Sequence, residues 1–168
     1  TPSTTSLLMD TLIEAGVPAG VANMVLGSGL VAGVPLSNHP DIDMVSFTGG
    51  LNTGKQIMVE ASKTVKKIAL ELGGKNPNIV FADANQEAAL DNALNAVFLH
   101  SGQVCSAGAR LLVEESIHDT FVTELARRAD LIRLGFPGDE ATETGALISE
   151  NHLIKIEKYV AQAISEGA

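Results

Sequence analysis

The chain has 168 residues, a hydrophobic fraction of 45% and a formal net charge of −9 at pH 7. This share of apolar residues excludes an intrinsically disordered chain. The negative charge, without any lysine- or arginine-rich block, argues against nucleic acid and anionic membranes as partners. No apolar run approaches the ~20 residues of a membrane-spanning helix. The single cysteine excludes an internal disulfide and is typical of a protein from the reducing cytoplasm.

In the first half of the chain, short apolar runs alternate with amphipathic stretches. Hydrophobic periodicity and glycine punctuation predict helices over 3–16 and 51–62, and strands over 21–27, 44–50 and 66–74. In the second of these helices, the spacing predicts that Ile57, Met58 and Ala61 lie near one face.

The second half continues the alternation. Strands are predicted over 78–83 and 109–115, and helices over 83–100, 116–132 and 150–167. The clearest helix has an apolar stripe, and Asp83 three residues before Gln86 gives it a start like a capping box. The stripe consists of Ala89, Leu90, Ala93, Leu94, Val97 and Phe98. Strands separated by helices of this length predict an α/β fold with a wound parallel sheet.

The segment "FTGGLNTG" places Gly49 and Gly54 around the start of a helix that follows a strand. Glycine lets a ligand approach the backbone, and the positive end of a helix favours a phosphate group there. The segment is therefore a candidate dinucleotide site. Its spacing differs from the common GxGxxG fingerprint, so an ordinary glycine turn remains the alternative.

Two further segments carry reactive side chains. Glu71 in "LELGGK" closes an apolar strand, where α/β proteins place their sites, and is a candidate general base; a surface glutamate is the alternative. Cys105 in "SGQVCSAGAR" stands among small residues that leave room for a substrate and offer N–H groups to an oxyanion. An inert core cysteine is its alternative. His100, five residues upstream, is a candidate partner of the thiol.

These segments occur in the order glycine turn, "LELGGK" and "GQVCSAGAR". Together they resemble the aldehyde dehydrogenase superfamily, whose FTGS-x3-G, ELGGK and GQ-x-C-x-A-x-x-R motifs have counterparts here. The flanks "EAGVPAGVANMVLG", "NPNIVFADAN" and "EATETGALIS" are similar as well, so the resemblance spans essentially the whole chain. Within the family, "FTGGLNTGKQIM" and "FLHSGQVCSAGARLLVEESI" are most similar to the members that act on glycine-betaine aldehyde.

The resemblance implies oxidation of a small-molecule aldehyde to a carboxylic acid, with NAD or NADP as acceptor and no metal. Carried over by motif, Cys105 is the nucleophile and, through its backbone N–H, an oxyanion donor, and Glu71 is the base that activates water. Val104 and Ser106 flank the nucleophile in the substrate pocket. The cofactor-binding residues are Gly49, Gly50, Gly54, Leu72 and Gly73. Gly50 stands where the family commonly has serine, so a hydroxyl contact to the pyrophosphate is lost.

The resemblance also implies a domain organisation. Residues 1–74 correspond to the later half of a Rossmann-like cofactor domain, and 75–168 to the early half of the catalytic domain. The family's PWN and E-x-F-G-P motifs are not among the 168 residues, and the first residue is not Met. We therefore expect a segment of a longer, homo-oligomeric subunit that is inactive in isolation. The alternatives are a truncated product without turnover and a thiol hydrolase that uses Cys105 and His100.

Overall fold

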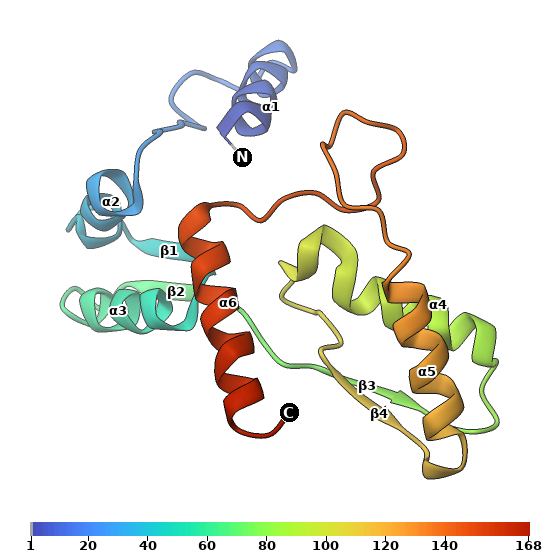
Figure 1. Cartoon of the computed structure of the whole chain (residues 1–168). Coiled ribbons are helices and arrows are strands. Elements are labelled where there is room, and N and C mark those ends of the chain that lie inside the picture. Colours follow the sequence, from blue (N-terminus) through green and yellow to red (C-terminus); the bar gives the residue numbers. More distant parts are fainter. Residues whose placement is uncertain (1) are drawn as a thin grey trace. The chain divides into compact units, whose positions relative to one another are not determined.

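The computed structural model describes residues 2–168, and the chain divides after Leu72 into two compact units. Each unit contains one pair of parallel strands with helices around it (Figure 1). Parallel strands joined through helices confirm the predicted α/β class.

The first unit is built around strands β1 (Met44–Gly49) and β2 (Lys67–Leu72), which helix α3 (Leu51–Ser62) connects. The strands pair in parallel, from Met44 opposite Lys67 to Gly49 opposite Leu72. Helix α1 (Pro2–Glu14), a π-helical turn (Gly29–Gly33) and the short helix α2 (Val34–Asn38) precede them.

Helix α3 buries one narrow face. Gly54, Ile57 and Ala61 are buried, at the three- and four-residue spacing that keeps side chains on the same side of a helix. Met58, four residues after Gly54 and three before Ala61, lies beside that face as predicted, although its side chain is 51% exposed.

The strand predicted over 21–27 is not formed in the structure. Among the described residues of the first unit, only β1 and β2 pair, so this segment has no neighbour to complete its backbone hydrogen bonds. Its side chains at Val21, Val25 and Leu26 are exposed. An apolar run specifies a strand only when a neighbouring strand lies alongside it.

The second unit contains strands β3 (Pro77–Val80) and β4 (Arg110–Val113), also parallel, from Pro77 opposite Arg110 to Val80 opposite Val113. Helix α4 (Gln86–Phe98) and a 3₁₀ turn (Leu99–Gly102) lie between them in the chain. After β4 come a 3₁₀ turn (Glu115–Ile117) and helices α5 (His118–Ala129) and α6 (Glu150–Ser165). The core of this unit consists of Val80, Leu90, Ala93 and Phe121.

Helix α4 begins two residues later than a cap at Asp83 would place it. Asn85 is the N-cap, and its Oδ1 accepts a hydrogen bond of 3.1 Å from the Ala88 backbone N–H. Gln86 does not close a capping box, because its side chain donates to the carbonyls of Ala84 (3.0 Å) and Ala82 (3.2 Å). Asn85 therefore outcompetes Asp83, since its oxygen reaches a free N–H of the first turn.

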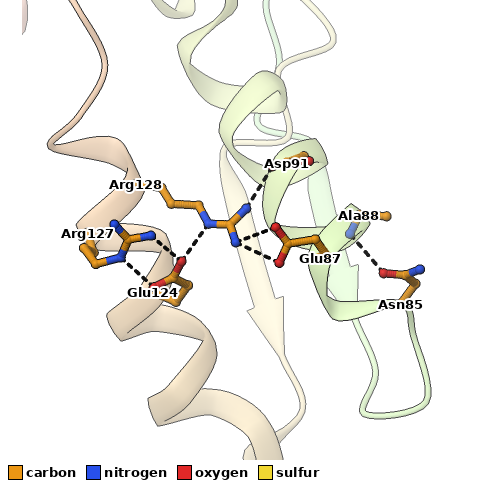
Figure 2. A network of polar contacts seen from close by, with 7 residues as sticks. All are labelled: Asn85, Glu87, Ala88, Asp91, Glu124, Arg127 and Arg128. Carbon is orange, nitrogen blue, oxygen red and sulfur yellow. Dashed lines mark hydrogen bonds and ion pairs between the residues drawn. The ribbon is translucent and has the colours of Figure 1, made fainter.

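Ion pairs join α4 to α5 (Figure 2). Arg128 donates to Glu124 (2.8 Å), and reaches across to Glu87 (2.7 Å) and Asp91 (3.0 Å) on α4. Arg127 also pairs with Glu124 at 2.7 Å. Hydrogen bonds from Arg127 and then Arg128 lower the pKa of Glu124 from 4.5 to about 2. Arg128 is only 19% exposed, so the pairs that it makes are partly shielded from water.

We predict that Arg128→Met destabilises the chain at pH 7 and that this difference disappears in acid. A carboxylate with a lowered folded pKa contributes its stability above pH 4.5 and loses it as the pH falls through about 2. Urea unfolding of both proteins at a series of pH values measures the difference. Arg133→Met, which removes only an exposed pair with Glu143, is the control and should change little. A difference that is constant with pH would mean that Arg128 acts through the packing of its methylene stem.

No helix within residues 2–168 combines the length and the apolar character that crossing a membrane requires.

Candidate functional site

Cys105 lies on a turn between the 3₁₀ segment and β4, and its side chain is exposed. The turn is closed by a hydrogen bond of 3.2 Å from the Ala107 N–H to the Val104 carbonyl. Ala107 and Gly108 are buried directly after it, and a Cβ at Gly108 would lie 3.1 Å from Asn78 and 3.2 Å from Ala96. The backbone is thus packed against the unit while the thiol faces outward. This exposure does not agree with an inert core cysteine.

Asn76 holds the turn from the side of β3. Its Nδ2 donates to the carbonyl of Cys105 at 3.0 Å and to that of Ala107 at 3.3 Å. Its own carbonyl accepts a hydrogen bond of 3.1 Å from the Arg110 N–H. Gly74 is close by, since a Cβ there would lie 3.5 Å from the Cys105 carbonyl oxygen. Asn76, two residues after "LELGG", therefore contacts the cysteine turn, and the sequence motifs did not predict this contact.

The segment directly before the turn has a left-handed backbone conformation and is anchored by hydrogen bonds. His100, Ser101 and Gly102 have φ angles of 51°, 57° and 75°. This conformation costs about 1–3 kcal/mol for each residue other than glycine, so contacts must stabilise it. The Ser101 Oγ donates to the Gly145 carbonyl at 2.7 Å and lies 3.0 Å from the Oγ1 of buried Thr144. These contacts keep the segment before Cys105 in one conformation.

Gln103 adds to this anchoring. Its Nε2 donates to the His100 carbonyl at 3.1 Å, and its Oε1 accepts from the Ile148 N–H at 3.3 Å. The His100 ring is exposed, and no hydrogen bond within residues 2–168 joins it to the thiol of Cys105. The cysteine–histidine pair is therefore not formed in the structure. Beside the thiol, Val104 is half-buried and Ser106 is exposed.

The glycine turn forms one end of the sheet in the first unit. Gly50 is the N-cap of α3, no side chain caps the helix, and its first turn contains no acidic residue. A Cβ at Gly50 would meet no atom within 4 Å, so the space beside this N-cap residue is open. An anion fits this helix end, both sterically and electrostatically.

At Gly54 and Gly49, a side chain would collide with neighbouring side chains. A Cβ at Gly54 would lie 2.8 Å from Leu72 Cδ2, so glycine lets α3 approach β2 closely. A Cβ at Gly49 would collide with the ring of Phe47, whereas Gly73 is open. Because Gly49 pairs with Leu72 in the strand register, the structure brings Gly49, Gly54 and Leu72 together.

Glu71 lies in β2 opposite Thr48 and is exposed. Within the part of the chain that the structure describes, its carboxylate makes no hydrogen bond and no ion pair. It is thus available to water, as a base that activates a water molecule must be. Glu71 belongs to the first unit and Cys105 to the second.

No three His, Cys, Asp or Glu side chains among residues 2–168 are grouped so that they could hold a metal ion. The chemistry available at these positions is that of a thiol, a carboxylate and an anion-binding helix end.

Comparisons with known proteins agree with this set of features. A model of the aldehyde dehydrogenase family matches residues 1–168. Betaine aldehyde dehydrogenase from Bacillus subtilis (strain 168) is 60% identical over 168 residues, covering 100% of this chain and 34% of the relative. The 5-carboxymethyl-2-hydroxymuconate semialdehyde dehydrogenase from Escherichia coli is 46% identical over 167 residues, covering 99% of this chain and 35% of the relative.

Solved structures are similar too. The 1.85 Å crystal structure of betaine aldehyde dehydrogenase from Staphylococcus aureus in complex with NAD+ matches with a TM-score of 0.93 at 50% identity, over 98% of this chain and 33% of that one. The chain spans about a third of the length of these relatives. The resemblance seen in the sequence is therefore confirmed over its whole length: the chain belongs to the aldehyde dehydrogenase family.

Proposed function

We propose that the subunit containing this chain oxidises betaine aldehyde to its carboxylic acid, with NAD or NADP as the acceptor. The observation that carries the proposal is an exposed thiol on an anchored turn, in a chain 60% identical throughout to a betaine aldehyde dehydrogenase. A complex with NAD+ in the Staphylococcus aureus relative supports the cofactor.

In this mechanism, the thiolate of Cys105 attacks the aldehyde carbon and forms a thiohemiacetal. The backbone N–H of Cys105 donates to the oxyanion, and the anchored turn keeps that N–H in place as negative charge develops. NAD or NADP, when bound, supplies the acceptor for the hydride that leaves the carbon attached to Cys105. Loss of this hydride leaves a thioester on Cys105.

Glu71 completes the cycle as a general base. It takes a proton from water, and the resulting hydroxide attacks the thioester, which releases the carboxylic acid and the Cys105 thiolate. Its exposed and unpaired carboxylate in the described chain supports this role. A carboxylate engaged in an ion pair would be a weaker base.

The cofactor site is the glycine turn with the start of α3. Gly50 lets the backbone come close to the pyrophosphate, Gly49 ends β1 beside it, and Leu72 and Gly73 lie at the end of the adjoining strand. The open and uncapped helix end at Gly50 supports this assignment, because it fits an anion without a serine hydroxyl. Gly54 contributes indirectly, through the close packing of α3 on β2.

The substrate pocket includes Val104 and Ser106 beside the thiol. A quaternary ammonium ion is usually held against aromatic rings. This chain has no Trp and a single Tyr, and the Tyr159 ring already lies 6.0 Å from the Nζ of Lys155. We therefore assign any Trp and any further Tyr of the ammonium site to parts of the subunit outside these 168 residues.

The two units correspond to parts of two domains in this proposal: residues 1–74 to the cofactor domain and 75–168 to the catalytic domain. The isolated chain should be inactive and prone to self-association, because it exposes large apolar side chains on α1, on α6 and elsewhere. Leu7, Leu8, Ile154 and Ile164 are examples, each more than 40% exposed. The complete subunit is proposed to be a cytoplasmic homo-oligomer.

The proposal is tested by assaying the full-length subunit with betaine aldehyde, NAD and NADP. We expect formation of reduced cofactor that depends on the aldehyde, together with an equal amount of the carboxylic acid. The 168-residue chain, assayed in parallel and examined by light scattering, should show no turnover and should self-associate. A full-length subunit that oxidises none of a panel of aldehydes would refute the proposal. An active monomer of the short chain would refute the assignment of essential parts to the rest of the subunit.

A further inference from the structure

We infer that Asn76 is a positioning residue for the nucleophile, which it holds in place through two hydrogen bonds to the cysteine turn. The inference rests on the proposed function, because it assigns Asn76 a task only if Cys105 is the nucleophile. The two bonds run from Nδ2 to the carbonyls of Cys105 and Ala107, 29 and 31 residues away in the chain.

Asparagine provides the two hydrogen-bond donors that this position requires. The amide nitrogen of asparagine has two hydrogens, and the turn presents two carbonyl oxygens that can only accept. Both donors are therefore used, and the acceptors dictate the orientation of the amide. Aspartate has the same shape but no donor, and its charge would repel both carbonyls. Serine could donate only one hydrogen bond.

Asn76 is itself firmly placed. Pro77 follows it, and a residue before proline is restricted to extended conformations. Pro77 pairs with Arg110 in the β3–β4 register, and the Arg110 N–H donates to the Asn76 carbonyl at 3.1 Å. The amide thus extends from the edge of the sheet in the second unit and links the cysteine turn to that sheet.

The bond to the Cys105 carbonyl restricts the dihedral angle that orients the thiol. That carbonyl belongs to the peptide plane after Cys105, so holding it restricts ψ of Cys105 and with it the direction of the Cα–Cβ bond. The bond is exposed, so water can replace the amide at this carbonyl at little cost in stability. Loss of this bond should therefore affect the alignment of the thiol more than the folding of the chain.

The first experiment measures catalysis in the full-length subunit. Asn76→Ala should lower kcat per active site by about 10–10²-fold, the effect of misplacing a reacting group by about 1 Å, with an unchanged KM for NAD. Asn76→Asp should be at least as slow, and Asn76→Ser should recover part of the rate. The matched control is Asn78→Ala in β3, two residues further along the chain, since the Asn78 Cβ lies near Gly108 and its side chain does not bind the Cys105 carbonyl. The active sites are counted by calorimetric titration with NAD, which does not depend on the rate of the first step.

The second experiment observes the hydrogen bond itself in the 168-residue chain. Because the chain has one cysteine, labelling with [1-¹³C]cysteine marks the carbonyl of Cys105 alone. Its stretching band in the infrared should shift and broaden in Asn76→Ala and Asn76→Asp, since mobile water molecules replace a single fixed amide donor at this exposed carbonyl. It should not move in Asn78→Ala.

The outcomes separate the inference from the proposed function. Unchanged kcat per active site in Asn76→Ala, or an unshifted carbonyl band, overturns the inference. A lower count of active sites with normal kcat means that Asn76 only supports folding, and also overturns it. If Asn76→Ala does not fold, a normal kcat or an unshifted band in Asn76→Ser overturns the inference instead. Activity that survives in Cys105→Ala refutes the proposed function instead, whatever Asn76 does.

Discussion

Cys105→Ala should abolish aldehyde oxidation in the full-length subunit, with a loss of roughly 10⁵-fold or more, the scale for removal of a covalent nucleophile. Alanine cannot form the thiohemiacetal, and the chain has no second cysteine. Reduced cofactor should form neither in a burst nor in steady state.

NAD binding is the control for Cys105→Ala, because the glycine turn belongs to the other unit and does not depend on the thiol. Calorimetry should therefore give the same affinity for NAD as in the unmodified subunit. Turnover within about tenfold of the unmodified subunit would contradict the nucleophile assignment, since no group left at that position could replace the thiol.

Glu71→Gln should slow the second half of the reaction and spare the first. Glutamine keeps the shape of the side chain but cannot take a proton from water, so hydrolysis of the thioester should slow by about 10²–10⁴-fold. Hydride loss from the thiohemiacetal does not require that base. Rapid mixing should therefore show an initial burst of reduced cofactor, followed by steady turnover that has nearly stopped.

Glu60→Gln is the matched control in the same unit, because it changes a carboxylate in α3 whose partner is Lys63. It should leave both the burst and the steady rate unchanged. The assignment of Glu71 would be refuted if its variant lost the burst but hydrolysed a preformed thioester at the normal rate. In that case Glu71 would act on the thiol before hydride transfer.

The order of most helices and strands could be predicted from the sequence, because it follows from local patterns. The spacing of Ile57 and Ala61 predicts a helix with one buried face, and the apolar runs over 44–50 and 66–74 predict strands. Both predictions need only the periodicity of the backbone and the preference of apolar side chains for the interior. The glycine turn, Glu71 and Cys105 could likewise be found, because each lies in a short motif.

Features that depend on partners distant in the chain could not be predicted in this way. The segment 21–27 has the composition of a strand, but a strand forms only where another backbone supplies its hydrogen bonds, and none does so in the described first unit. Likewise, Asp83 and Asn85 are both good caps, and which of them starts α4 depends on which oxygen reaches a free N–H.

By itself, the sequence determined the α/β class, the family and the candidate site residues, because these depend on residue types at short spacing. Only the tertiary structure decided how the thiol is held. The Cys105 turn is anchored by Asn76, 29 residues upstream, and by the contact of Ser101 with Gly145, 44 residues downstream of that serine. Such contacts form only when the folded backbone brings distant segments within about 3 Å, a distance that no local pattern encodes.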